Sequence, residues 1–209
     1  MKREGRILGL TGGLASGKSE ALRCFAQAGA WTLSMDALHH ELSKPGGPVY
    51  RAILRVLGRA VLRPDGTLDR PRLAERAFSH ARTLARLERA SHPILLRELR
   101  RRLARRRAKT AVVDAAILFE KGWQEGFDAA IVVEAPRGVR LARAVRRGMS
   151  RRDALRRLRS QWTCPRRRAL ADMILFNDGS LPQLRRAVRD CLQSLEGAAR
   201  MTYKNTEHK

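Results

Sequence analysis

A glycine-rich segment with the pattern Gly12-x4-Gly17-Lys18-Ser19 constrains the fold of this 209-residue chain more than any other feature. An apolar segment at 6–11 precedes it and predicts a buried strand, and residues 20–28 follow with the apolar spacing of a helix. In such a setting, glycines let backbone amides surround a phosphate, and the N-terminus of the helix faces the anion. The segment therefore predicts a loop that binds the phosphates of a nucleoside triphosphate.

The same pattern assigns roles to its last residues. Lys18 is expected to reach the β- and γ-phosphates, and the hydroxyl of Ser19 is expected to hold Mg²⁺. An ordinary glycine turn that caps a helix is the simpler alternative, but the strand before and the helix after the loop favour phosphate binding. The residues expected to bind ATP in this loop are Gly13, Leu14, Ala15, Ser16, Gly17, Lys18 and Ser19.

The rest of the chain alternates between strand and helix patterns. Four further apolar segments, at 30–34, 110–115, 128–134 and 173–176, predict short buried strands. Strands that alternate with helices predict an α/β fold with a five-stranded parallel sheet flanked by helices. Residues 37–109 are helical with turns, including a long basic helix over 84–107 that is expected to be interrupted or kinked near Pro93.

These patterns predict the domain organisation. The core is expected at 1–36, 110–136 and 172–196, with a helical insertion at 37–109 and an arginine-rich lid at 137–171. The lid pattern contains three short helices, the third at 165–171. The last helix is expected to begin after Ser180 and to end near Leu195, and residues 197–209 read as a polar tail.

Composition and charge narrow the class of protein. A hydrophobic content of 44% excludes general disorder, and no apolar run approaches the roughly 18 residues of a membrane helix. The start of the chain has no signal-peptide pattern, and its three cysteines fit neither a zinc site nor a disulfide framework, so a cytoplasmic location is expected. The net charge is +24, with seven lysines and 37 arginines, which reflects a GC-rich genome or anionic partners.

Several motifs, in order along the chain, resemble one family. The segment Leu10-Thr11-Gly12-Gly13-Leu14-Ala15-Ser16-Gly17-Lys18-Ser19 resembles the L-T-G-G-I-G-S-G-K-S of dephospho-coenzyme A kinases. The remaining blocks are Asp36 (the end of D-A-D), Leu42-x2-Pro45-Gly46 (V-x-P-G), 64–70 (A-D-G-x-L-D-R), His92-Pro93 (L-H-P), Leu118-Phe119-Glu120 (the end of P-L-L-F-E), the lid residues Arg143, Arg147, Arg151, Arg157 and Gln161, and 177–180 (D-N-x-G).

This resemblance covers roughly residues 6–195 and implies an activity. It implies a P-loop kinase that uses ATP and Mg²⁺ to phosphorylate the ribose 3′-hydroxyl of dephospho-CoA, the last step of coenzyme A synthesis. The helical insertion would then bind the acceptor, and the lid would be mobile. The chain departs from the family pattern at Ala15, Glu20, Ser34, Ala116 and Phe176, of which Glu20 and Ser34 bear most on the magnesium environment.

Candidate catalytic residues follow from the motifs and the resemblance together. Asp36 is expected to orient or deprotonate the acceptor hydroxyl, and the alternative is a helix N-cap. Arg143 and Arg147 lie four residues apart on one helix face, where they would neutralise charge on the transferred phosphoryl group, and a solvated basic face is the alternative. Lys18 completes this catalytic set.

The other candidate residues concern the metal and the two substrates. Asp114 ends an apolar strand, where it would hold Mg²⁺ through water or simply begin a turn. Asn177 would lie near the adenine, although Asn-Asp-Gly is also a good turn. His92, Glu120 and Arg157 are acceptor-binding candidates, each with a structural alternative.

Two other functions remain open from the sequence. One is a P-loop kinase for another nucleoside or small-molecule acceptor. The other is a P-loop protein that binds nucleic acid through its basic surface, for which strong salt dependence is expected. The densest basic run, at 99–107, is interpreted as a solvated helix face, with attraction of anionic substrates and contact with nucleic acid as the alternatives. It contains no aromatic residue, so it offers no stacking platform for single strands.

Overall fold

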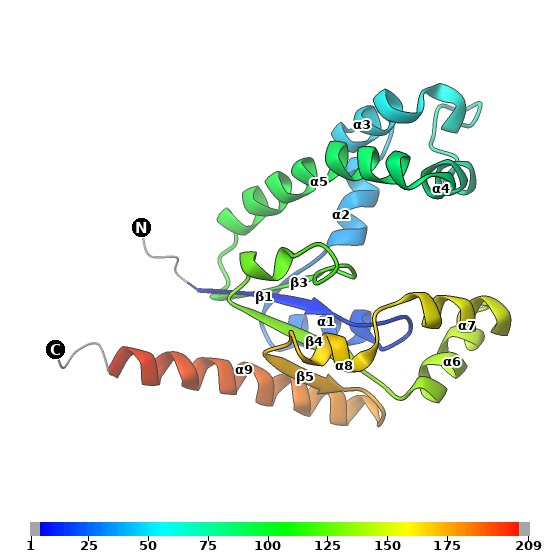
Figure 1. The fold of residues 1–209 in the computed structure, drawn as a ribbon. Coiled ribbons are helices and arrows are strands. Elements are labelled where there is room, and N and C mark those ends of the chain that lie inside the picture. Colours follow the sequence, from blue (N-terminus) through cyan, green and yellow to red (C-terminus); the bar gives the residue numbers. More distant parts are fainter. Residues whose placement is uncertain (1–4, 205–209) are drawn as a thin grey trace. The chain divides into compact units, whose positions relative to one another are not determined.

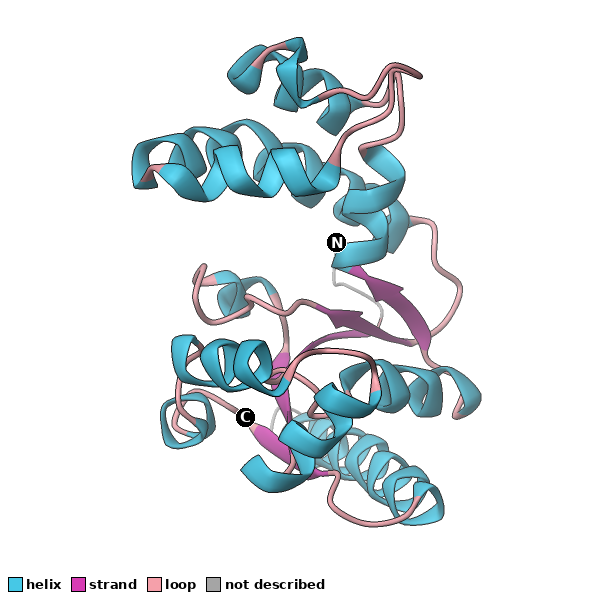
Figure 2. Ribbon diagram, turned by 90° about the vertical axis from the view of Figure 1, so that its right-hand side faces the viewer, coloured by secondary structure: helices cyan, strands magenta, loops and turns pink. Residues whose placement is uncertain are grey.

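The computed structural model describes residues 5–204, and for 196–204 it describes the backbone alone. The described chain divides into two compact units (Figure 1). The helical unit is Ser34–Arg107, and the sheet unit comprises the described residues on either side, 5–33 and 108–204. Helices surround the strands of the sheet unit, whereas the helical unit consists of helices and loops (Figure 2).

Five strands form the sheet, in the order β2-β3-β1-β4-β5. They are β1 (Arg6–Thr11), β2 (Trp31–Ser34), β3 (Thr110–Asp114), β4 (Ala129–Glu134) and β5 (Met173–Phe176). β1 pairs in parallel with β3 and with β4, so that Leu10 lies beside Asp114 and Thr11 beside Val132. The predicted α/β fold with a five-stranded parallel sheet is confirmed.

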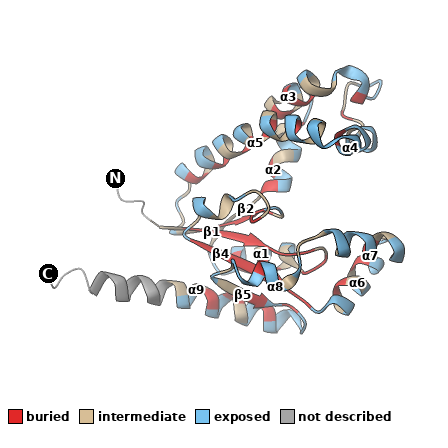
Figure 3. Ribbon diagram, viewed as in Figure 1, coloured by how far each residue is buried: buried red, intermediate tan, exposed pale blue. Residues whose placement is uncertain are grey.

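Two helices share the main core with the sheet. α1 (Lys18–Gln27) and α9 (Leu181–Lys204) pack against each other, and α9 also packs against β5. Figure 3 shows buried residues along the strands and exposed residues on the outer side of α9. The largest buried side chains of this cluster are Phe25, Leu8, Leu10, Ile131 and Leu184. Alternate residues of the strands supply this core because successive side chains point to opposite faces of a sheet.

The predicted end of the last helix is wrong, because α9 continues to Lys204 instead of ending near Leu195. Residues 198–201, Ala-Ala-Arg-Met, are strong helix formers, and they carry the helix past Gly197. The proposed polar tail at 197–209 is therefore helical as far as 204, and residues 205–209 lie outside the described residues.

Three helices follow β4 in the arginine-rich segment. They are α6 (Arg137–Arg146), α7 (Arg151–Ser160) and α8 (Cys164–Arg168), and a 3₁₀ turn, η2 (Trp123–Gly126), precedes β4. α6 and α7 pack against each other through Ala144 and Ala154. The third helix is shorter than the predicted 165–171, since it ends at Arg168.

The helical unit is built around one long helix. α5 (Ala81–Ala104) packs against α3 (Pro48–Leu57) and α4 (Arg70–Ser79), and α2 (Met35–Leu42) and the 3₁₀ turn η1 (Arg59–Val61) complete the unit. Of the two outcomes expected near Pro93, an interruption or a kink, the interruption is wrong, because α5 runs on with Pro93 inside it. A proline costs a helix one hydrogen bond, and the buried leucines of α5, at 87, 95, 99 and 103, anchor both of its halves.

Candidate active site

The glycine-rich loop between β1 and α1 has the geometry of an anion-binding loop. Gly17 adopts a left-handed conformation, with φ of 101°, and begins α1, so the free amides of the first helical turn point out of the loop. The ammonium of Lys18 turns back and donates to the carbonyl oxygen of Gly12 at 2.9 Å. Ser19 is exposed at the start of the same helix. The predicted phosphate-binding residues therefore lie together.

Ala15 stands out within this loop. It is the one non-glycine residue among those described that has a positive φ, of 54°. An L-residue in this conformation carries a steric cost of about 1–2 kcal/mol. The motif that this segment resembles has glycine at this position, and glycine avoids that cost. The Ala15 side chain is buried against Ala144 and Ala154, so contacts with α6 and α7 offset part of that cost.

Asn177 and Arg143 connect the end of β5 to the loop. The Asn177 side chain donates from Nδ2 to the carbonyl oxygen of Ser16 at 2.8 Å. Arg143 in turn donates from Nη1 to the carbonyl oxygen of Asn177 at 2.8 Å. A Cβ on Gly17 would overlap the Asn177 amide, so glycine is needed here for space as well as for its backbone angle.

A cavity of about 340 Å³ opens beside this connection. Its polar lining brings together the two predicted catalytic arginines, Arg143 and Arg147, with the predicted nucleotide residue Asn177. The complete lining is Gly17, Glu20, Arg143, Arg146, Arg147, Asn177, Gly179, Leu181 and Leu184. A cavity that combines apolar side chains with cationic groups next to a phosphate loop has the chemistry required for a nucleoside phosphate.

Glu20, one of the departures from the family pattern, lies in the lining of the same cavity. Its carboxylate forms an ion pair with Arg23 at 2.5 Å on the surface of α1. Phe176, another departure, is 54% exposed, and the guanidinium of Arg168 lies over its ring at 5.4 Å.

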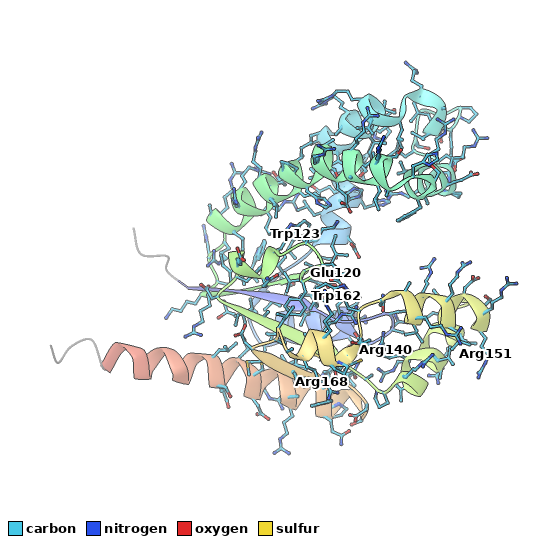
Figure 4. All side chains as sticks on the ribbon, viewed as in Figure 1. Glu120, Trp123, Arg140, Arg151, Trp162 and Arg168 are labelled. Carbon is cyan, nitrogen blue, oxygen red and sulfur yellow. The ribbon has the colours of Figure 1, made fainter. Side chains whose placement is uncertain are left out.

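Glu120 and Arg157 lie outside this cavity. Glu120 forms an ion pair with the buried Arg167 at 3.4 Å through Oε1, and its Oε2 has no hydrogen-bond partner among the described residues. Arg167 also donates to the carbonyl oxygen of Trp162 at 2.8 Å. Figure 4 labels Glu120 and Trp162 in the sheet unit. Arg157 is exposed on α7.

Two predicted site residues belong to the helical unit. Asp36 is the second residue of α2 and is exposed, and the N-cap of that helix is Ser34, whose Oγ accepts from the Ala37 amide at 3.3 Å. The alternative interpretation of Asp36 as the N-cap is therefore wrong. His92 lies on α5 in the electrostatic surroundings of His39, whose pKa is lowered by burial and by the cation Arg70.

Oxygen ligands for Mg²⁺ are available at the carboxyl ends of the central strands. Asp114 is buried at the end of β3, and its neighbour in the sheet is Leu10, just before the loop. Together with the Ser19 hydroxyl, it supplies the hard oxygen donors that Mg²⁺ prefers. No cluster of three or more His, Cys, Asp or Glu residues that could hold a metal occurs in the described part of the chain.

Sequence reasoning missed Arg140, which the structure places against the loop. Its Nε donates to the carbonyl oxygen of Leu14 at 2.8 Å, and its side chain is buried. Burial lowers the pKa of this guanidinium. In a segment with thirteen arginines over 137–171, no spacing distinguishes one buried arginine from the exposed ones.

Across residues 5–204, no helix has the length and apolarity needed to cross a membrane.

Comparisons with known proteins give a consistent result. The family described as dephospho-CoA kinase matches residues 6–183. The dephospho-CoA kinase of Corynebacterium diphtheriae is 37% identical over 192 residues, which cover 90% of this chain and 96% of the relative. That of Aquifex aeolicus is 33% identical over 189 residues, with the same two coverages.

Solved structures share the fold of this chain. A crystal structure from Thermus thermophilus superposes with a TM-score of 0.82 at 34% identity, covering 92% of this chain and 99% of that one. A shikimate kinase from Acinetobacter baumannii superposes with a TM-score of 0.54 at 16% identity, covering 93% of this chain and 94% of that one, a likeness of fold alone.

Proposed function

Because this chain belongs to the dephospho-CoA kinase family and phosphorylates dephospho-CoA to coenzyme A, we propose how its residues carry out that reaction. The family and the activity expected from the sequence are confirmed, and kinase membership implies the use of ATP. The family match decides against a different acceptor. We propose that the ATP phosphates bind the loop at 12–19 and that the nucleoside occupies the cavity beside Asn177. The convergence of loop amides, Arg143 and Asn177 carries this proposal.

Charge on the transferred phosphoryl group is proposed to be neutralised by three cations. Lys18 would exchange the Gly12 carbonyl for β- and γ-phosphate oxygens, a movement of one flexible side chain. Arg143 and Arg147 line the cavity beside the loop, and their guanidinium groups would face oxygens that become more negative in the transition state. Of the arginines in the described part of the chain, only these two and Arg146 line this cavity, and Arg143 is further marked by its hydrogen bond to the Asn177 carbonyl oxygen.

Mg²⁺ is proposed to be held by the Ser19 hydroxyl directly and by Asp114 through water. The exposed position of Ser19 and the place of Asp114 beside the loop support this assignment. When bound, the ion would neutralise part of the negative charge of the nucleotide phosphates.

The acceptor side of the reaction is proposed to involve Asp36 and three further residues. Asp36 would accept the proton of the ribose 3′-hydroxyl, and its exposure and lack of a capping role leave its carboxylate available for this. Glu120 would contact the acceptor through Oε2, which has no hydrogen-bond partner among the described residues. His92 and Arg157 complete the proposed acceptor-binding set.

The basic surface is proposed to attract the anionic substrates. Residues 137–171 carry thirteen arginines and a single acidic residue, Asp153. Such a field raises encounter rates at low salt, so kcat/KM for dephospho-CoA should fall as the salt concentration rises. The same charge predicts weak binding of nucleic acid, which should inhibit the reaction at low salt and lose its effect at high salt.

A coupled assay of ADP release tests the proposal. Wild type is expected to release ADP with dephospho-CoA and not with shikimate, the acceptor of an enzyme that shares the fold. Lys18→Met should lower kcat by about 10²–10³-fold, the size typical for loss of one group that stabilises transition-state charge. Lys109→Met is the matched control, because Lys109 is exposed before the amino end of β3, at the opposite edge of the sheet. A Lys18→Met enzyme with more than a third of wild-type kcat would contradict the assignment.

A further inference from the structure

Arg140 is a buried cation that bonds to neutral groups. It lies in the first turn of α6 and is 6% exposed. Its guanidinium donates to the carbonyl oxygen of Leu14, to Oε1 of Gln161 at 3.1 Å, and more weakly to Sγ of Cys164 at 3.6 Å. No carboxylate of the described residues lies within hydrogen-bonding distance of it. A buried charge with neutral partners costs free energy. We therefore expect that Arg140 serves to hold its neighbours in place rather than to stabilise the fold.

The neighbour that Arg140 fixes is Leu14 of the phosphate loop. Gln161, the residue directly after α7, accepts from the Leu14 amide at 2.8 Å through the same Oε1 that Arg140 bonds. The amide and the carbonyl of Leu14 are therefore held by two residues that are also bonded to each other. We call Arg140, Gln161 and Leu14 the loop clasp. Figure 4 shows Arg140 at the junction between α6 and the loop.

Two residues of the loop, Gly13 and Ala15, have conformations or sizes that fit this arrangement. A Cβ on Gly13 would overlap the guanidinium of Arg140, so glycine at this position makes room for the clasp. Ala15, the residue directly after Leu14, has the strained backbone described above. Strained residues persist where the surrounding structure fixes them, and the clasp together with the contacts of Ala15 to α6 and α7 does so here.

We propose that Arg140 is a positioning residue for phosphoryl transfer, which acts through Leu14 and Gln161 to hold the loop in its phosphate-binding conformation. The proposal rests on the proposed binding of ATP phosphates to this loop. Removing the clasp frees the two peptide groups on either side of the Leu14 Cα to rotate, and the amides that follow them then lose their common direction toward the phosphate. The cost appears in ATP affinity, because the loop must be ordered each time ATP binds.

The experiment measures ATP affinity, turnover and stability for four variants. Isothermal titration with ATP–Mg²⁺ gives Kd, the coupled assay gives kcat and KM, and thermal unfolding gives Tm. Arg140→Met and Gln161→Met should each weaken ATP binding by about tenfold, the scale of one charge-assisted hydrogen bond. The double variant should bind ATP no more weakly than the weaker single variant, because both residues hold the same residue, Leu14. Arg137→Met, at the exposed start of α6, is the matched control and should bind ATP like wild type.

A rescue measurement distinguishes positioning from a general loss of structure. Ethylguanidinium added to Arg140→Ala should restore part of the ATP affinity, whereas ethylammonium should not, because one ammonium cannot reproduce the planar fork that bonds Leu14 and Gln161. If Arg140→Met fails to fold, Gln161→Met carries the test alone, since it leaves the guanidinium in place.

Several outcomes would overturn the inference. One is an Arg140→Met enzyme that binds ATP within twofold of wild type while Lys18→Met still loses turnover, which leaves the proposed function intact. Another is a loss of affinity in Arg140→Met that Gln161→Met does not share. A wild-type enzyme that fails to bind ATP would instead refute the proposed function itself.

Discussion

Substitutions at Ser34 and Asp36 should separate the stability of α2 from catalysis, although the two residues are only two positions apart. Ser34 is the N-cap, and its Oγ accepts from the Ala37 amide. Asp36 is exposed in the first turn and makes no capping bond. Ser34→Ala should therefore lower stability and leave turnover intact. Asp36→Asn should instead lower turnover and leave stability nearly unchanged.

The geometry sets the size of each effect. Loss of an N-cap costs about 0.5–2 kcal/mol, and the 3.3 Å length of this bond places Ser34→Ala in the lower half of that range. For a chain of this size, the fall in Tm is about 2–4 °C per kcal/mol. Asp36→Asn removes one exposed charge near a helix N-terminus, worth about 0.3 kcal/mol. If Asp36 takes the proton of the acceptor hydroxyl, the kcat of the Asp36→Asn enzyme should be lower than that of wild type by about 10²–10⁴-fold.

The two measurements are thermal unfolding and ADP release in the presence of dephospho-CoA. Ser34→Asp is a further control, because aspartate is also a good N-cap and should keep the wild-type Tm. The reasoning is refuted if Asp36→Asn keeps kcat within threefold of wild type, or if Ser34→Ala loses turnover while its Tm is unchanged.

Three other predictions concern binding, pH and reactivity. Asn177→Ala leaves the buried carbonyl of Ser16 without its donor, so urea denaturation should show a loss of about 1–3 kcal/mol together with weaker ATP binding. Hydrogen bonds from two arginines lower the pKa of Glu98 to about 2 from an ordinary value of 4.5, so its stabilising contribution is complete above 4.5 and is lost as the pH falls toward 2. Thermal unfolding should accordingly show that Glu98→Gln loses less stability than wild type between pH 5 and pH 2. Burial raises the pKa of Cys191 to about 11, so mass spectrometry after iodoacetamide treatment at pH 8 should find Cys164 alkylated and Cys191 intact.

Local patterns were sufficient to predict most of the fold. Each strand is a short apolar run between turn signals, and the phosphate loop is a contiguous motif whose chemistry depends on residues adjacent in sequence. The helix ends were less predictable. Pro93 and Gly197 are residues that disfavour helix, yet α5 continues through Pro93 and α9 continues through Gly197.

The sequence by itself determined the family, the parallel sheet and the loop that would bind phosphates, because these depend on residue type and spacing within short segments. Only the tertiary structure decided which arginine of 37 is buried against the loop, which residue caps α2, and that Asn177 bonds Ser16. Those contacts join residues from 3 to 161 positions apart, and an arginine carries the same charge and the same local pattern whether it faces solvent or a backbone carbonyl. Packing, which the linear pattern does not record, makes the distinction.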